Sequence, residues 1–383
     1  RVTTQHDRHN MTDSTPTADS GALTLKANVI WTFGGNVIAA ACQWGLLALL
    51  TRTIPDANTG QFVMAMAICT PVFMFAGLDL RTLQVTDSSN RFRFSEYLAL
   101  RLAVGLLATL LVPSGAFLFG ADVSTVTVVA GVALAKYVEL MADILYGVMQ
   151  KAERMDYVSR SVVMHGILSA VAMALGVLAS GSVVVGVFAA ALARAVILNL
   201  NDVPKTTRLY WQCESVSSQA VRQAIRRLLT LDMAQPAKLI VEGGPLAVKQ
   251  LVVSLNTQVS RYFVGGLGFA AAGIFGPIAS SVTAATTISR ALNQAVAARL
   301  GRLAGEHRDV EFRRLIGQLQ LGYLAIGLCG IGVAWQFGEW LLAFAYRPDF
   351  AQYNDVLILI IVAVAVQYQS GILDIAMVTL RRV

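Results

Sequence analysis

Five polar residues recur at helical spacing within one apolar stretch of the chain. Lys136, Glu139, Asp143, Tyr146 and Gln150 follow one another at steps of three or four residues, which places them on one face of an α-helix. A charged side chain at mid-bilayer costs at least about 2.5–3.5 kcal/mol, so this face must look inward. One interpretation is a structural Lys136–Glu139 ion pair that joins helices. The other is a site facing a hydrated cavity, in which Asp143 is a second acid that can titrate.

Other polar side chains also interrupt apolar stretches. Asn36 and Gln43 share a helical face near the N-terminus and serve either helix packing or a cavity. Arg261 is near the end of its stretch, where it either reaches toward water or binds an anion with its planar guanidinium. Ser280 and Thr283 belong to a hydroxyl-rich stretch that either bends a helix or lines a hydrated path.

Two further residues could titrate inside the membrane. Asp374 follows Gln367 by seven residues, so the two share a helical face. His165 is a single imidazole in its apolar stretch, either a packing residue or a proton relay.

The elements that must position these residues are membrane-spanning helices. Hydrophobic residues make up 56% of the 383 and charged residues only 14%, against roughly 25% charged in a soluble domain. The apolar residues also form blocks long enough to cross a bilayer as helices. These blocks predict spans at 25–50, 61–80, 97–119, 124–150, 160–180, 182–200, 245–264, 268–293, 315–338 and 353–380.

The basic residues predict the orientation of the spans. Lys and Arg concentrate in alternate loops and at both ends, while the opposite loops hold only Arg52 and Arg347. The positive-inside rule therefore places both termini in the cytosol. Because the net charge of +7 follows the loops in this way, it does not indicate a nucleic-acid partner.

The same pattern predicts four regions. Residues 1–22 form a disordered cytosolic leader, 23–200 an N-lobe of six spans, 201–244 a cytosolic linker, and 245–383 four spans of a second lobe. Within the linker, residues 220–232 form a basic amphipathic helix, which lies either on the inner leaflet or in solvent.

Several kinds of chemistry have no motif here. No glycine precedes a lysine, so the phosphate-binding loop of nucleotide hydrolases is absent. There is no HExxH zinc motif, and the four cysteines suggest neither a disulfide framework nor a metal site. The chain is therefore predicted not to be an enzyme, and any transport would depend on an ion gradient or on the substrate's own gradient.

Several blocks of the sequence resemble one known family. The stretch KYVELMADILYGVMQKAERMDYVSRS (136–161) is similar to the fourth-span signature of bacterial O-antigen and polysaccharide flippases. These flippases belong to the multidrug/oligosaccharidyl-lipid/polysaccharide exporter superfamily. Further agreement comes from 49–87, from FSEYLALRL (94–102) and from 254–304.

The resemblance implies an all-α polytopic membrane protein with two six-helix lobes around a central cavity. About ten spans are recognised, so the C-lobe is incomplete, and we expect the chain to be a fragment of a longer protein. Members carry undecaprenyl-diphosphate-linked repeat units of O-antigen or exopolysaccharide from the cytosolic to the periplasmic leaflet of the bacterial inner membrane. They use H⁺ or Na⁺ and no cofactor. The implied partners are the lipid-linked oligosaccharide, membrane lipids, a polysaccharide polymerase and chain-length proteins.

Combined with the resemblance, the polar residues receive roles. Lys136 and Arg261 are expected to attract the diphosphate, and Glu139, Asp143 and Asp374 to couple ion movement. The sugar contacts are assigned to Asn36, Gln43, Ser280 and Thr283.

Three alternatives stay open. A drug/cation antiporter of the same superfamily would use the acids of 136–143 to meet an organic cation. A membrane oligosaccharide polymerase would need a sizeable outer loop with several arginines, whereas the longest, 339–352, holds only Arg347. A non-transporting scaffold for glycan assembly is the third.

Overall fold

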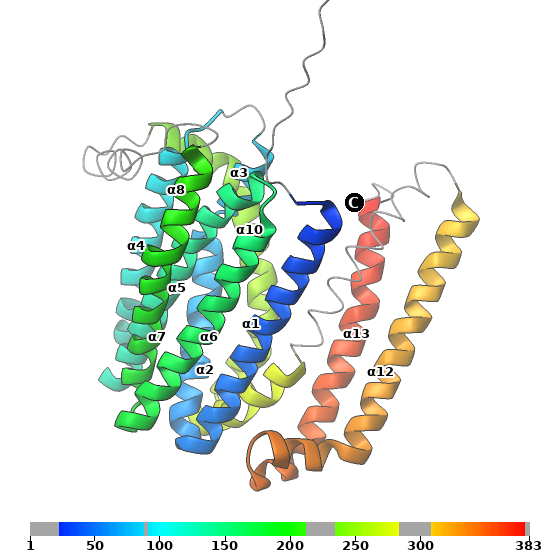
Figure 1. Cartoon of the computed structure of the whole chain (residues 1–383). Helices are drawn as coiled ribbons and strands as arrows, with labels where there is room; N and C mark the ends of the chain where they lie inside the picture. The colour runs from blue at the N-terminus through cyan, green and yellow to red at the C-terminus, as the bar shows by residue number, and fades with distance from the viewer. Residues whose placement is uncertain (1–22, 88–90, 212–233, 283–307, 380–383) are drawn as a thin grey trace, which may run out of the picture.

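The computed structural model describes residues 23–87, 91–211, 234–282 and 308–379 (Figure 1). Every regular element in these ranges is a helix, which confirms the predicted all-α class. The predicted leader 1–22 and the amphipathic helix 220–232 lie outside the described residues.

The N-lobe is a bundle in which α5 is central. Helix α5 packs against α4, α7 and α2, while α6 packs between α1 and α7. The bounds are α1 Leu25–Thr53, α2 Asp56–Ala76, α3 Leu80–Thr86, α4 Phe94–Leu118, α5 Val123–Lys151, α6 Met155–Ser180 and α7 Val183–Ile197. A π-helical turn, η1 (Leu198–Asp202), then leads into α8 (Val203–Trp211), so the helix continues past residue 200.

Helix α10 (Ala234–Gly265), which includes the first span predicted for the C-lobe, packs along α2 of the N-lobe. An apolar helix, Phe269–Val282, follows it. The hairpin of α12 (Asp309–Ala345) and α13 (Asn354–Thr379) is joined by the 3₁₀ turn η2 (Pro348–Tyr353). Figure 1 shows this hairpin beside α1, away from α4, α5 and α7.

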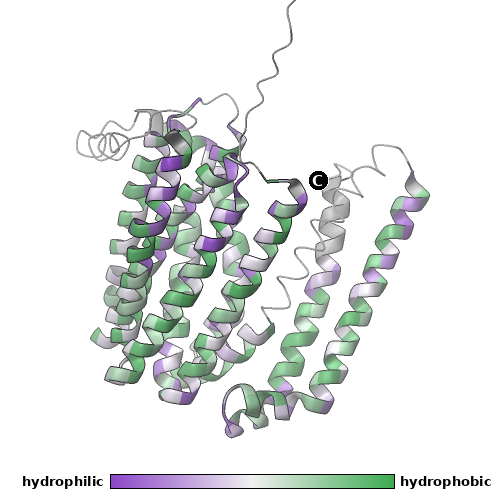
Figure 2. Ribbon diagram, viewed as in Figure 1, coloured by the Kyte–Doolittle hydropathy of each residue, from purple (hydrophilic) through white to green (hydrophobic). Residues whose placement is uncertain are grey.

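Hydrophobic residues predominate along the helices, as a bilayer requires (Figure 2). Large hydrophobic side chains such as Leu110, Leu175 and Leu192 are more than half exposed, a surface that lipid tails cover. Among the described residues, seven helices are long and apolar enough to span a membrane. They are Lys26–Thr53, Asp56–Thr86, Phe94–Leu118, Met155–Ser180, Val183–Leu209, Val310–Ala345 and Pro348–Ser370.

Local signals define where α5 begins and α6 ends. Asp122 caps α5 by accepting a hydrogen bond from the Thr125 backbone N–H at 3.1 Å, as N-cap residues do. The hydrogen bond from the Thr125 hydroxyl lowers the pKa of Asp122. Gly181 ends α6 in the left-handed region, with φ of 67°, which glycine adopts without a steric penalty.

The α2–α3 turn differs from the uninterrupted span predicted for 61–80. Helix α2 ends at Ala76, and Leu78 and Asp79 adopt φ of 49° and 46°. Such backbone angles are uncommon for residues other than glycine. They redirect the chain so that the short helix α3 packs against α5.

The α12–α13 hairpin is attached to the N-lobe at the predicted periplasmic end, where α1 ends and α2 begins. Arg347 forms an ion pair with Asp56 at 2.8 Å, and the Arg52 Nε donates to the Tyr346 carbonyl at 2.5 Å. Trp44 donates to the Tyr346 hydroxyl at 2.9 Å. We call these five residues the interlobe latch. Between described residues, the hydrogen bonds and ion pairs that join α12, η2 and α13 to the N-lobe all belong to it or to Phe344 beside it.

Two glycines bring the lobes into backbone contact beside the latch. A Cβ built on Gly60 of α2 would lie 1.7 Å from the Phe269 carbonyl, and one on Gly273 would lie 2.0 Å from the Asp56 carbonyl. Any larger residue therefore separates α2 from the helix Phe269–Val282.

We expect Gly60→Ala to destabilise the protein, because its methyl group collides with the backbone at residue 269. Overpacking of this kind costs about 1–3 kcal/mol. The measurement is the midpoint of thermal unfolding of the purified protein in detergent. Gly45→Ala is the matched control, since a Cβ on Gly45 of α1 meets nothing within 4 Å. Equal midpoints for both variants would contradict the close packing.

Candidate functional site

The polar face of α5 meets cations from three other helices. The Lys136 Nζ lies 3.1 Å from Glu139 Oε2, and the Arg194 Nη1 of α7 lies 3.0 Å from the same oxygen. Glu139 therefore has two cationic partners, one from its own helix and one from α7. The Lys136–Glu139 ion pair considered from the sequence is formed.

Asp143 is also held by two cations. The Arg81 Nη1 of α3 lies 3.3 Å from Oδ1, and the Arg101 Nη2 of α4 lies 2.8 Å from Oδ2. Arg101 is fully buried and donates a second hydrogen bond to the Gly77 carbonyl at 2.8 Å. Arg101 thus fixes both Asp143 and the end of α2. We call Lys136, Glu139, Asp143, Arg81, Arg101 and Arg194 the α5 cluster.

The remaining residues of the α5 face extend this network toward the predicted cytosolic end. The Arg81 Nε donates to Gln150 Oε1 at 2.9 Å, and its guanidinium lies 5.7 Å from the centre of the Tyr146 ring. Four of the five polar residues predicted on this face therefore contact neighbouring helices, while Lys136 bonds to Glu139 of its own helix.

The α5 cluster stays accessible and carries an excess of positive charge. The side chains of Glu139 and Asp143 are 49% and 36% exposed, so the protein's own packing does not enclose them. Four cations surround these two carboxylates. Each carboxylate therefore has two cationic partners but neutralises only one positive charge, and the remaining charge can attract an anion.

The arginines of the cluster were not predicted as site residues. The predicted spans 97–119 and 182–200 include Arg101 and Arg194, and Arg81 follows the predicted span 61–80. A signal existed for Arg101 and Arg194, because each is flanked by apolar residues of its own helix, in LALRLAVG and ALARAVIL. Arg81 reaches the site only because of the α2–α3 turn.

A second buried network surrounds Asp202 in η1. Asp202 is fully buried and accepts hydrogen bonds from the Ser161 hydroxyl at 2.5 Å and the Asn201 amide at 2.7 Å. The His165 Nε2 lies 2.9 Å from the other carboxylate oxygen, Oδ2. Tyr146 joins the two networks, since its hydroxyl lies 2.8 Å from that of Ser161. Asp202, assigned to the linker from the sequence, is therefore part of the N-lobe interior.

Arg261 of α10 has no acidic partner among the described residues. Its Nη1 donates to Gln258 Oε1 at 2.5 Å. The neighbouring Tyr262 holds α10 on α2 by donating to the Ala67 carbonyl at 2.7 Å. Arg261 is therefore a half-buried cation whose charge is not neutralised by an ion pair in the part of the chain described.

The other predicted site residues are distributed over α1 and the C-lobe. Asn36 and Gln43 are exposed on α1 and form no hydrogen bond with another described residue. The Ser280 hydroxyl donates to the Gly276 carbonyl at 2.8 Å within its own helix. Thr283 and the side chain of Asp374 lie outside the described residues. None of these contacts the α5 cluster in the described structure.

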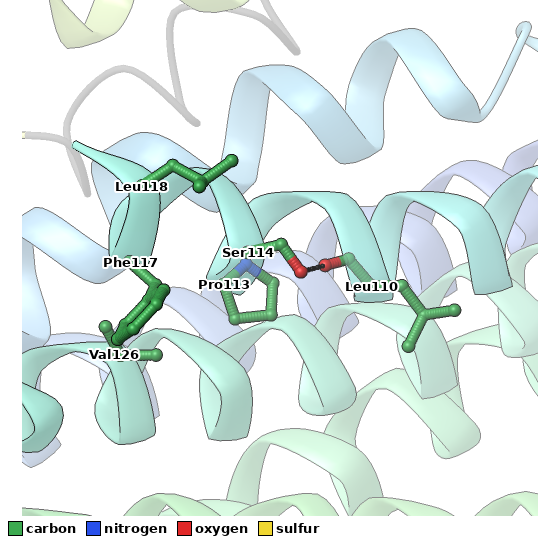
Figure 3. Close-up of a pocket in the computed structure, with 6 residues that line it drawn as sticks. All are labelled: Leu110, Pro113, Ser114, Phe117, Leu118 and Val126. Atoms are coloured by element: carbon green, nitrogen blue, oxygen red, sulfur yellow. Dashed lines mark hydrogen bonds between the residues drawn. The ribbon is translucent and has the colours of Figure 1, made fainter.

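An apolar pocket lies on α4, away from these residues (Figure 3). Its volume is about 390 Å³, and its lining, which includes Pro113, Phe117 and Val126, is almost entirely apolar. Phe117 is 63% exposed, so the pocket opens on the outer surface and suits a lipid chain and not a charged headgroup.

The chain was compared with known proteins. No family model matches it. A capsular polysaccharide biosynthesis protein of Staphylococcus aureus, CapF, is 22% identical over 343 residues, which cover 87% of this chain and 80% of that protein.

Solved structures of MATE transporters match the fold. The bent form of VcmN from Vibrio cholerae gives a TM-score of 0.52 at 13% identity, covering 92% of this chain and 82% of that one. An inward-facing multidrug resistance transporter of the MATE family and MOP superfamily gives 0.52 at 12% identity, covering 92% and 81%. An outward-facing one gives 0.51 at 12%, covering 93% and 84%. The chain has the MATE fold, and the predicted resemblance to the exporter superfamily is confirmed at the level of the fold.

We expect Asp143→Asn to destabilise the protein, because it leaves the buried Arg101 with a neutral partner. Breaking a buried ion pair in this way costs about 3 kcal/mol or more. Glu139→Gln should cost less, since its partners Lys136 and Arg194 are partly exposed. Thermal unfolding of the two variants in detergent checks the order. A Glu139→Gln variant less stable than Asp143→Asn would contradict the structural role of Arg101.

Proposed function

We propose that the chain is a carrier of the inner membrane, N-terminus in the cytosol, that moves undecaprenyl-diphosphate-linked oligosaccharide to the periplasmic leaflet by ion-coupled alternating access. The headgroup passes between the lobes while the prenyl tail stays in lipid. A polysaccharide polymerase and chain-length proteins would then use the flipped units. The multi-pass MATE fold and the likeness to a capsule biosynthesis protein support the proposal.

The observation that carries the proposal is the excess of cations in helices of the bundle. The α5 cluster holds four cations and two carboxylates, and with Asp202 four cations meet three carboxylates. Arg261 adds a cation that has no acidic partner among the described residues. A diphosphate that leaves water loses hydration, and fixed cations replace it.

The arrangement of the lobes supports alternating access. The α12–α13 hairpin is bonded to the N-lobe by the interlobe latch at the predicted periplasmic end. Opening of such a latch, together with closure at the other end, would expose a central site to each side in turn. In this proposal Glu139 and Asp143 hold the cations in position, and the coupling role predicted for Glu139, Asp143 and Asp374 stays a prediction.

A drug/cation antiporter is the second candidate, favoured by the likeness to multidrug resistance MATE transporters. Such a carrier needs a carboxylate that is free to meet an organic cation. Glu139 and Asp143 each already have two cationic partners, which favours an anionic cargo.

The test is leaflet exchange in vesicles that contain the purified protein and a fluorescent undecaprenyl-diphosphate oligosaccharide. We expect the wild-type protein to move the glycan and not to take up cationic dyes. A protein that lengthens the glycan is a polymerase, and one that transports only dyes is an antiporter. Either result would overturn the proposal.

In the same assay we expect Arg261→Ala to lower the initial rate of glycan movement at least about tenfold, because a hydrogen bond to a charged group is worth roughly 1.5–3 kcal/mol. Arg261→Lys should retain more activity, since the charge persists. Arg313→Ala is the matched control, because Arg313 is exposed at the predicted cytosolic end of α12. Equal rates for Arg261→Ala and Arg313→Ala would remove Arg261 from the substrate path.

A further inference from the structure

The Asp202–His165 pair is a buried acid–base pair to which no role was assigned. We propose that it is the proton-binding site that couples transport to a pH gradient. This inference rests on the proposed function, because it names the residues through which an ion gradient would act on the carrier.

The geometry suits a single exchangeable proton. Asp202 is fully buried, the His165 side chain is 8% exposed, and Nε2 faces Oδ2 at 2.9 Å. The other ring nitrogen, Nδ1, is buried and has no hydrogen-bond partner among the described residues. When His165 is neutral and donates from Nε2, the pair carries one negative charge and Nδ1 is free to accept a proton.

Proton binding at the pair has a simple balance. A proton from water forms one N–H bond at Nδ1, and the charge of the pair changes from −1 to 0. The positive imidazole then faces the carboxylate directly, as in a buried ion pair. Release of the proton to water on the other side of the membrane restores the starting charge.

The direct contact between His165 and Asp202 favours a proton over a metal cation. The other polar contacts of Asp202 come from protein side chains: Ser161 and Asn201 donate hydrogen bonds to it, and the Tyr146 hydroxyl contacts that of Ser161. Within the described residues no group of three His, Cys, Asp or Glu side chains could hold a metal ion.

The backbone at the pair is also unusual. Asp202 ends the π-helical turn η1, and π-helical turns occur often at functional sites. The turn adds one residue to the helix, which rotates the following chain by about 100°. The Asp202 side chain, at the end of this turn, thereby reaches α6 and contacts Ser161 and His165.

The helices packed against α6 and η1 also carry charged or titratable groups. Helix α5 supplies Tyr146 and Glu139, and α7 supplies Arg194, which bonds to Glu139. Helix α1 places Cys42 against Gly166, the residue after His165. Helix α8 supplies Lys205, which lies over the Tyr157 ring of α6.

These neighbours connect the pair to the α5 cluster. The chain Asp202–Ser161–Tyr146 leads to Arg81, whose guanidinium lies over the Tyr146 ring and contacts Asp143. The positive charge that the proton adds at His165 therefore increases the excess positive charge that an anionic headgroup meets.

The unpartnered nitrogen connects proton binding to conformation. An Nδ1–H donor that is buried without an acceptor is unfavourable, because it has lost its hydrogen bond to water. Protonation therefore favours a different packing of α6 against its neighbours, in which Nδ1 finds a partner. Since α6 packs along the whole of α1 (Figure 1), and α1 carries Trp44 and Arg52, such a shift reaches the interlobe latch. Acid should accordingly loosen the latch.

The first experiment measures glycan movement in vesicles with and without an imposed pH gradient. We expect the gradient to raise the wild-type rate roughly fivefold or more. Asp202→Asn and His165→Gln should keep movement without a gradient and lose the stimulation. Glu311→Gln is the matched control, because Glu311 is an exposed acid at the start of α12. Stimulation that persists in both pair variants, or is absent from the wild type, overturns the inference.

The second experiment does not depend on transport, so it distinguishes failure of this inference from failure of the proposed function. Cysteines at Thr53 and Phe344, on the two sides of the latch, are joined with a short bis-maleimide. The background is a chain whose four native cysteines are alanine. We expect less cross-linking at acidic than at neutral pH, and no such change after Asp202→Asn or His165→Gln. Cross-linking that does not depend on pH, or a pH dependence that survives both substitutions, overturns the inference even when no glycan moves.

Discussion

The structure depends on one constraint, the cost of charge inside a hydrocarbon layer. A cation such as the fully buried Arg101 is stable there only because Asp143 and the Gly77 carbonyl satisfy it. Helices α3, α4, α5 and α7 must therefore meet where their charged residues pair. The position of the α2–α3 turn, with its uncommon backbone angles, follows from the need to bring Arg81 to Asp143.

The same constraint distinguishes the two polar centres of the N-lobe. In the α5 cluster, each carboxylate is bound by two cations and is not enclosed by the protein's own packing, which suits the attraction of an anion from solution. Around Asp202, the carboxylate is enclosed and faces an imidazole with one open nitrogen. Tyr146 contacts both centres, so they lie close enough for a change of charge at one to alter the electrostatic potential at the other.

The contact between the lobes has a different character. At the latch, the hairpin is joined to α1 and α2 by an ion pair and by hydrogen bonds to the backbone carbonyl and the hydroxyl of Tyr346. Beside it, Gly60 and Gly273 allow the backbones of two helices to touch. Polar contacts of this kind exchange readily with water, whereas the apolar core of the N-lobe does not. Apolar packing joins the two parts elsewhere, since α10 packs along α2 and its Leu239 and Ala247 lie in an apolar core of the N-lobe.

The sequence alone determined the helical class, the positions of the helices and the polar face of α5, because length, apolar content and periodicity follow directly from a bilayer as solvent. It could not supply the partners of that face. Arg81 depended on a turn that breaks a predicted span, and Asp202 on a π-helical turn that extends a helix into the predicted linker. Arg101 and Arg194 lie in predicted spans, but the sequence does not show which acids they meet. Pairing of charges across helices is a property of tertiary packing, so only the folded structure decided which residues form the site.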